Sequence, residues 1–243
     1  MDEPPIRVAV VGLGIGRAHV LALKDVRHLY RVSTVCDLDG DLATDVAGWL
    51  RGVQPVTDLD EVLADDEIDV VDLCTPPHLH RAQVETVLRA GKDVFCEKPL
   101  VGSVAEVDEL ASIAAETGRT VMPILQYRFG HGIQKLRRVV DLGLAGNPYV
   151  ANVDVAWLRG QDYYDVPWRG RWATELGGTL TVHAAHHLDM LLHVLGPPVA
   201  VWARTATLVN QGIETEDCAA AVLRWADGSL ATVASTSGSA AEV

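Results

Sequence analysis

The sequence predicts an α/β protein that begins with a doubly wound parallel sheet and continues as an α+β domain with a largely antiparallel sheet. In the first half, short and nearly all-apolar strands alternate with helices, so helices should cover both faces of the sheet. In the second half, helices are joined to closely spaced strand-like runs. The last two of these runs are connected by Asp227-Gly228, which is a hairpin signal.

The elements of the first half follow from apolar runs and the residues that separate them. The expected strands are 6–11, 32–36, 55–56, 69–74, 93–96 and 120–125. The expected helices are a segment ending at about residue 28, then 42–50, 58–63, 79–90 and 103–117. Ser103 and Glu106 form a capping box at the start of the last helix, and Gly118 ends it. All strands of such a sheet end at one edge, where ligands bind.

The second half has a different order of elements. The expected helices are 132–142 and 180–195, and the expected strands are 149–157, 199–209, 218–225 and 229–235. A polar, aromatic loop over 159–171 separates the first strand from the second helix. We place the boundary near residues 125–130. This gives a doubly wound α/β domain over 1–126 and an α+β domain over 127–243.

The composition limits the class of partner. The net charge of −13 disfavours nucleic acid and an anionic membrane surface as partners. No apolar run reaches the length of a membrane span, and the acidic start lacks the features of a secretory signal. The cysteines are scattered without a C-x-x-C pair, so we expect reduced, buried thiols in a cytoplasmic protein.

A glycine-rich turn follows the first expected strand and opens the first helix. In the run Gly12-Leu13-Gly14-Ile15-Gly16, glycines permit a tight turn and let the backbone approach a pyrophosphate. The third glycine comes one residue earlier than in the strict G-x-G-x-x-G pattern, because Arg17 occupies the sixth position. A glycine-rich turn in a non-binding α/β domain would look the same, so this motif alone is weak evidence.

An acidic residue strengthens the interpretation of that turn. Asp37 ends the second expected strand, where a carboxylate can accept hydrogen bonds from both ribose hydroxyls of adenosine. The same carboxylate would repel a 2′-phosphate, which favours NAD over NADP. The alternative is that Asp37 caps the following helix. Together with the glycines, dinucleotide binding is the favoured interpretation.

Two further segments follow strands at the same edge of the sheet. Cys74-Thr75-Pro76-Pro77-His78-Leu79-His80 contains two prolines, which would fix a rigid apolar edge for a nicotinamide ring or simply start a helix. In Glu97-Lys98-Pro99, the lysine can polarise a hydroxyl or carbonyl oxygen or relay its proton. A solvated ion pair is the plain alternative, but the place of Lys98 in the ligand crevice argues for a functional role.

The second half carries a histidine-rich helix and an aromatic loop. The helix contains His183, His186, His187, Asp189 and His193, which fit a general acid/base, a metal site or ordinary core histidines. The polar side chains fall on more than one face, so we expect one catalytic histidine and no metal. The loop residues suit a sugar or polyol, or alternatively fix a long loop in place; they are Arg159, Tyr163, Tyr164, Trp168, Arg169 and Arg171.

Taken together, these residues resemble the Gfo/Idh/MocA oxidoreductases, which include glucose–fructose oxidoreductase and inositol 2-dehydrogenase. The resemblance runs along essentially the whole chain. The segments that match the family's motifs are 11–19, residue 37, 74–80, 90–99 and 177–196. It implies an N-terminal Rossmann-type domain with NAD as cofactor, and NADP less favoured. It further implies an enzyme that passes a hydride between the nicotinamide and a secondary alcohol or ketone of a sugar, cyclitol or related polyol.

The resemblance assigns roles residue by residue. Lys98 matches the lysine of the family's E-K-P motif, which binds the cofactor and the substrate oxygen, and a cis peptide is expected before Pro99. His186 matches the acid/base histidine of the H-x-x-D helix, with Asp189 as its aspartate. The expected cofactor-binding residues are Gly12, Gly14, Ile15, Gly16, Asp37, Thr75, Pro76, His80, Glu97, Lys98 and Arg128. The expected substrate-binding residues are Lys98, Tyr163, Trp168, Arg169, His183 and His186.

Two departures from the family pattern leave alternatives open. Val182 stands where many members have an aspartate, and the adjacent His183 is the expected substitute in proton transfer. Family members are usually longer, so we expect an incomplete second domain whose exposed sheet supports a homo-oligomer, either a dimer or a tetramer. The alternatives are a catalytically impaired dinucleotide-binding protein of the same fold and, less favoured, a metal-dependent hydrolase that uses the histidine helix.

Overall fold

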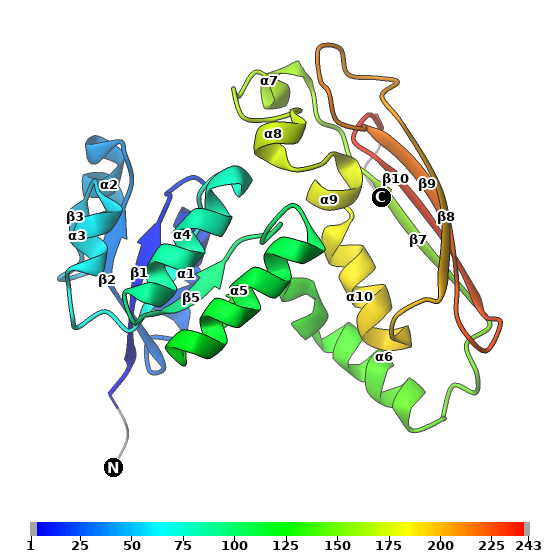
Figure 1. The fold of residues 1–243 in the computed structure, drawn as a ribbon, viewed down its shortest axis with the longest axis horizontal. Helices are drawn as coiled ribbons and strands as arrows, with labels where there is room; N and C mark the ends of the chain where they lie inside the picture. The colour runs from blue at the N-terminus through cyan, green and yellow to red at the C-terminus, as the bar shows by residue number, and fades with distance from the viewer. Residues whose placement is uncertain (1–3, 241–243) are drawn as a thin grey trace. The chain divides into compact units, whose positions relative to one another are not determined.

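The computed structural model describes residues 4–240 and divides the chain into two compact units. Unit 1 comprises Met1–Ile124 and unit 2 comprises Leu125–Val243. Figure 1 shows the order of their helices and strands. Among residues 4–240, no helix combines the length and apolar character that crossing a bilayer requires.

Unit 1 is the predicted doubly wound sheet. Its strands are β1 (Ile6–Val11), β2 (Tyr30–Cys36), β3 (Gln54–Val56), β4 (Val70–Leu73), β5 (Asp93–Cys96) and β6 (Val121–Pro123). They form one six-stranded sheet in the order β3-β2-β1-β4-β5-β6, and every pairing is parallel. The strand order reverses between β1 and β4, which is where such sheets bind ligands.

Helices cover both faces of this sheet, as the apolar strands predict. They are α1 (Gly16–Asp25), α2 (Gly40–Ala47), α3 (Leu59–Leu63), α4 (Pro77–Arg89) and α5 (Val104–Thr117). Val8 and Val10 of β1 pack with Val20 of α1 and with residues of α2. Ala9 and Val11, which point the other way, belong to a second core with residues of α3, α4 and α5.

Unit 2 contains a mixed sheet and a group of helices. Its elements are η1 (Gln126–Phe129), α6 (His131–Asp141), β7 (Val150–Ala156), α7 (Gln161–Tyr164), α8 (Trp172–Glu175), α9 (Thr179–Val182), α10 (Ala185–Leu195), β8 (Ala200–Ala206), β9 (Cys218–Arg224) and β10 (Leu230–Thr236). The strand order is β7-β10-β9-β8; β10 pairs with β7 in parallel, and the other two pairings are antiparallel. The sheet is therefore largely antiparallel, as expected.

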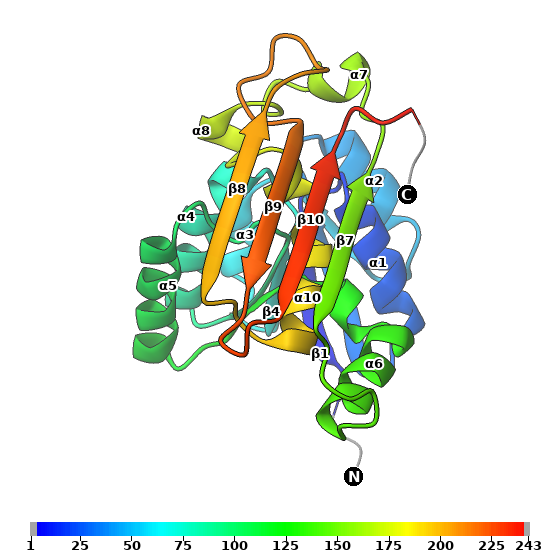
Figure 2. The same ribbon diagram turned by 90° about the vertical axis from the view of Figure 1, so that its right-hand side faces the viewer.

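One face of this second sheet packs against helices and the other is open. Leu223 and Val233 form a core with Leu191 of α10, while Trp202 and Val222 on the opposite face are 57% and 38% exposed. Figure 2 looks onto the open face, with α10 behind the strands. Because side chains alternate along a strand, the open face takes every second residue of each strand.

The prediction of one helix over 180–195 is wrong, because the segment forms two helices. α9 ends at Val182 and α10 begins at Ala185. Between them, the backbone N–H of Ala184 donates to Thr179 O at 2.8 Å, one residue further back than in a regular α-helix. Ala184 is fully buried, so packing holds this widened turn.

The loop over 159–171 also differs from the prediction, since it contains the single-turn helix α7.

Candidate functional site

The three glycines after β1 are each required for a different reason. Gly12 has a φ of +88°, and a Cβ atom there would lie 2.7 Å from the carbonyl oxygen of Cys74. A Cβ at Gly16 would lie 3.0 Å from Val10 Cγ1, so this glycine allows α1 to pack closely on β1. A Cβ at Gly14 would meet nothing within 4 Å, which leaves open space beside the backbone. The turn therefore provides a surface that a pyrophosphate can approach.

The N-terminus of α1 is suited to bind an anion. Ile15 is the N-cap residue and makes no side-chain capping hydrogen bond. The first turn of the helix contains no acidic side chain. Backbone N–H groups and the helix dipole therefore face the open space beside Gly14 without a competing carboxylate of the same helix.

Asp37 lies beside the glycine-rich turn and does not cap α2. Its Oδ2 accepts a hydrogen bond from Leu13 N at 2.7 Å, and its Oδ1 accepts one from Asp39 N at 3.0 Å. The capping carboxylate of α2 belongs to Asp39, which accepts from the backbone N–H groups of Asp41 and Leu42. The Asp37 carboxylate is therefore fixed in place and half-buried, and each oxygen retains a lone pair for a ribose hydroxyl.

His80 joins the loops that follow β4 and β5. Its Nδ1 lies 2.8 Å from Pro99 O and its Nε2 lies 2.8 Å from Thr75 O. The side chain is fully buried, and this burial lowers its pKa against the effect of the two carbonyls. The His80 side chain therefore links the loop after β4 to the loop after β5. Pro76, in the loop after β4, is the N-cap residue of α4.

Glu97 and Lys98 lie at the carboxyl end of β5. The peptide bond between Lys98 and Pro99 is cis, as the resemblance predicts. Glu97 Oε2 accepts a hydrogen bond from the backbone N–H of Lys98 at 3.0 Å. Burial alone would raise the pKa of Glu97, but His19 and the Lys98 charge hold it below its ordinary value. Glu97 is therefore an ionised, nearly buried carboxylate that fixes the backbone of Lys98.

His19 lies beside Glu97 in this candidate site, although no sequence pattern pointed to a role for it. Its Nδ1 lies 2.8 Å from Asp72 Oδ2, and its Nε2 lies 3.2 Å from Glu97 Oε1. One sequence signal could have found this cluster: Asp72 is a carboxylate inside an otherwise apolar strand, which requires a polar or charged partner.

In unit 2, Arg128 and Asp189 form a two-point ion pair. Arg128 Nε donates to Asp189 Oδ2 at 2.8 Å, and Nη2 donates to the other carboxylate oxygen. Asp189 is nearly buried, and the pairing raises the pKa of Arg128. This pair links η1 to α10, so it fixes the start of the unit to the helix that carries His186.

Histidines of α10 and of the turn before it join an aromatic cluster. His186 stacks on Tyr127 at a centroid distance of 4.5 Å, and His183 lies edge-on to Trp157 at 5.2 Å. His187 contacts both Tyr127 and Trp157, and burial lowers its pKa. His183, His186 and His187 are therefore grouped. His193 is elsewhere, since its Nε2 lies 3.4 Å from Gln134 Nε2.

The loop after β7 continues this cluster. Arg169 lies over the ring of Tyr163 at 3.7 Å and over Trp168 at 4.3 Å. Tyr163 in turn lies 5.9 Å from His183, and burial raises its pKa. The buried carboxylate of Glu175 accepts from Gly170 N at 2.5 Å and pairs with Arg169 at 3.5 Å. The expected substrate residues of unit 2 thus form one connected set, and the loop is also fixed in place.

Comparison with known proteins gives matches along both units. A family model described as "Oxidoreductase family, NAD-binding Rossmann fold" matches residues 6–125, and the model of the GFO/IDH/MocA C-terminal domain matches residues 133–242. A myo-inositol 2-dehydrogenase from Thermotoga maritima is 29% identical over 94% of this chain and 67% of its own length. The oxidoreductase YrbE of Bacillus subtilis, itself uncharacterised, is 25% identical over 94% of this chain.

Solved structures resemble the chain along its whole length. The WlbA dehydrogenase from Bordetella pertussis, in complex with NADH and UDP-GlcNAcA, is 30% identical with a TM-score of 0.92, over 100% of this chain and 70% of that one. GenD2 from gentamicin A biosynthesis, in complex with NAD, is 27% identical with a TM-score of 0.89, over 99% and 68%. The chain spans 66% of YrbE and 56% of a second curated relative, so it covers about two thirds or less of them.

Proposed function

The chain belongs to the Gfo/Idh/MocA oxidoreductase family, and from this premise we propose that it is an NAD-dependent dehydrogenase or reductase. Its substrate would be a secondary alcohol or ketone of a sugar, cyclitol or related polyol. The observation that carries the proposal is the turn at Gly14, whose open backbone lies beside the uncapped N-terminus of α1. Bound there, the cofactor would supply the hydride chemistry, and the chain's residues would bind and orient the reactants.

The fixed carboxylate of Asp37 supports NAD as the preferred cofactor. Both of its oxygens already accept backbone N–H groups, so the side chain cannot swing away from a ligand without losing those bonds. A ribose with free hydroxyls can donate to the remaining lone pairs, while a 2′-phosphate would meet a negative charge at short range. NADP is therefore the less favoured cofactor.

Lys98 and His186 are the proposed catalytic residues. Lys98 would polarise the substrate oxygen with its ammonium group, and His186 would carry the proton, with His183 as the second histidine in proton transfer. The stacking of His186 on Tyr127 restrains the imidazole ring. The contacts of His183 with Trp157 and Tyr163 restrain the other ring in the same way.

The aromatic and arginine side chains of unit 2 support a sugar or cyclitol substrate. Tyr163, Trp168 and Arg169 combine ring faces with hydrogen-bond donors, which suits the apolar faces and hydroxyls of such molecules. Two of the similar proteins are a myo-inositol 2-dehydrogenase and a WlbA dehydrogenase in complex with UDP-GlcNAcA, a sugar nucleotide. Location in the cytoplasm is proposed from the free, buried thiols of Cys36, Cys74 and Cys96.

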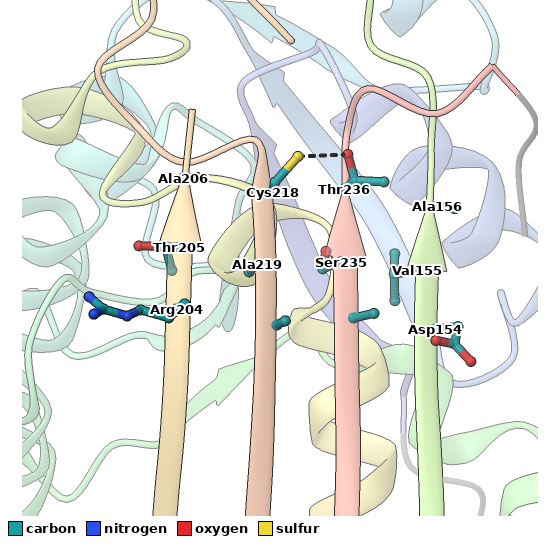
Figure 3. A pocket seen from close by; sticks show the side chains of 12 residues that line it. Asp154, Val155, Ala156, Arg204, Thr205, Ala206, Cys218, Ala219, Ser235 and Thr236 are labelled. Atoms are coloured by element: carbon teal, nitrogen blue, oxygen red, sulfur yellow. Dashed lines mark hydrogen bonds between the residues drawn. The ribbon is translucent and has the colours of Figure 1, made fainter. Parts of the chain in front are cut away.

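The open face of the second sheet supports a homodimer. One row across this face consists of Arg204, Ala220, Ala234 and Asp154 on neighbouring strands. Figure 3 shows Arg204 and Asp154 on the two outer strands. All four residues of the row line a shallow hollow of about 410 Å³. A two-fold axis through the middle of the row would bring each arginine opposite the aspartate of a second copy. Light scattering should then show a dimer that Arg204→Glu weakens and that Arg204→Glu with Asp154→Arg restores.

Val182 favours a second candidate function, a dinucleotide-binding protein without turnover. This apolar, nearly buried side chain stands where many family members have an aspartate, so one proton carrier is absent at that position. Such a protein would bind NADH and turn over none of the polyols tested. Turnover of any of them would exclude this second candidate.

Calorimetric titration with NADH, followed by turnover on a panel of inositols and sugars, tests the proposal. Gly14→Ala should fold normally, because its Cβ meets nothing within 4 Å, but should weaken NADH binding at least about tenfold by blocking the pyrophosphate. Gly132→Ala is the matched control, because a Cβ at Gly132 also meets nothing within 4 Å. Unchanged NADH affinity in Gly14→Ala, or a wild-type chain that does not bind NADH, would reject the proposed cofactor site.

A further inference from the structure

A cluster of buried ionisable groups lies behind the carboxyl ends of β4 and β5. His19 of α1 stands between two carboxylates, with Nδ1 2.8 Å from Asp72 Oδ2 and Nε2 3.2 Å from Glu97 Oε1. Asp72 is 2% exposed and Glu97 is 9% exposed. Three separate elements of unit 1 thus meet through one imidazole ring.

The geometry determines the charge of that ring. Each ring nitrogen faces a carboxylate oxygen, and an ionised carboxylate only accepts hydrogen bonds, so both nitrogens must carry a proton to donate. Burial alone would lower the pKa of His19, but hydrogen bonds to Asp72, Cys74 and Glu97 outweigh it and raise the pKa to about 12. The imidazolium therefore compensates two nearly buried negative charges, which would be costly to leave unpaired.

The remaining groups that face His19 agree with a protonated ring. The Cys74 sulfur lies 3.4 Å from His19 Nδ1, and burial raises the pKa of this thiol to about 12, which keeps it neutral. The Lys98 charge, like His19, lowers the pKa of Glu97. Donor atoms of His19, Asp72 and Cys74 lie within 4.8 Å of one another, as in a metal site. A metal ion would have to displace the proton between His19 and Asp72 and bind a neutral thiol, so we do not favour one.

We propose that His19 is a positioning residue: a protonated imidazole that holds Glu97, and through Glu97 the backbone of Lys98, in the orientation that presents the lysine side chain to the cofactor. The link is the hydrogen bond from Lys98 N to Glu97 Oε2, while Glu97 Oε1 faces His19. The part of this proposal that concerns the cofactor rests on the proposed function. The charge of His19 and its hold on Glu97 do not.

A neutral side chain at position 19 cannot compensate the negative charges of Asp72 and Glu97. Glutamine could donate to one carboxylate through its amide, but it would leave two negative charges buried without a cation between them. One carboxyl group would then take up a proton or shift its position. Removing the Asp72 charge as well would relieve that conflict, so Asp72→Asn should partly rescue His19→Gln. A side chain that acts only by filling space predicts no such rescue.

Nitrogen NMR of the imidazole side chains in the full-length protein tests the charge of His19 without any activity. The signal that disappears in His19→Gln is assigned to His19. We expect both ring nitrogens of His19 to be protonated at pH 8 and to remain so up to pH 9. A neutral ring at pH 8 would overturn the proposal. So would one equivalent of bound metal in the wild-type protein that is lost in His19→Gln.

NADH titration of His19→Gln, Asp72→Asn and the double variant tests the positioning role. His19→Gln should weaken NADH binding at least about tenfold, and the double variant should recover at least about threefold of that loss. His28→Gln, at an exposed histidine of the same unit, is the matched control and should bind as the wild type does. Wild-type affinity in folded His19→Gln, or a double variant no better than His19→Gln, contradicts the role.

The two experiments separate the possible failures. If the wild-type protein binds no NADH, the proposed function fails, and the NMR measurement still decides the charge of His19. If His19→Gln does not fold, the double variant and Asp72→Asn still test the charge pairing, because the double variant should then recover a folded protein. A double variant that is as unfolded as His19→Gln would contradict the proposal.

Discussion

Replacing Gly12 with alanine should destabilise unit 1 by about 2–5 kcal/mol. A non-glycine residue at a φ of +88° is strained by about 1–2 kcal/mol. The new Cβ would lie 2.7 Å from Cys74 O, 2.8 Å from Cys74 C and 2.9 Å from Thr75 N. These are backbone atoms that no rotamer change can move, so overpacking adds about 1–3 kcal/mol.

Gly91→Ala is the matched control for this prediction. Gly91 also lies in unit 1 and has a φ of +77°, but a Cβ there meets nothing within 4 Å. Its substitution should cost only the backbone strain, about 1–2 kcal/mol. Urea unfolding followed by far-ultraviolet circular dichroism gives both free energies of unfolding, with the slope against urea checked for each variant. The two free energies of unfolding could instead agree within about 0.5 kcal/mol. The close approach of Gly12 to the loop after β4 would then have no energetic consequence, which contradicts the prediction.

Three further predictions concern the site. Lys98→Ala should lower kcat on any active polyol about 10²–10⁴-fold, and full turnover in steady-state assays would remove Lys98 from the chemistry. Asp37→Asn should reduce the preference for NADH over NADPH in calorimetric titrations, and an unchanged ratio of affinities would mean that the carboxylate does not select the cofactor. The folded pKa of His19, about 12, lies above its ordinary value of 6.5, so its stabilising contribution is fully present below pH 6.5 and is lost as the pH rises towards 12. The free energy of unfolding should therefore fall between pH 7 and pH 9 by up to about 1.4 kcal/mol per pH unit relative to His19→Gln; parallel profiles in urea titrations would contradict this.

Local sequence patterns predict most of unit 1. The strands β1 and β5 have the predicted bounds, because each is an apolar run whose backbone pairs on both sides within the sheet. The capping box of α5 is also confirmed, since Ser103 accepts from Glu106 N and Gly118 adopts a left-handed conformation. The end of α1 is less well predicted: the helix stops at Asp25 instead of near residue 28, and no glycine marks that end.

Features that depend on distant residues could not be predicted from local patterns. His19 pairs with residues that are 53 and 78 positions away in the sequence, and Arg128 pairs with a residue 61 positions away. The break between α9 and α10 depends on the burial of Ala184, which the apolar pattern alone does not reveal. The sequence therefore predicts which segments end at the ligand edge, and the structure adds the ion pairs that hold their side chains in place.

A crystal structure of the full chain with NADH bound tests the central claim most directly. We expect the pyrophosphate against Gly14 and the first turn of α1, the adenosine ribose on Asp37, and the Lys98 ammonium within contact distance of the nicotinamide ring. A cofactor bound away from the glycine-rich turn, or a Lys98 side chain directed away from the nicotinamide, would contradict it.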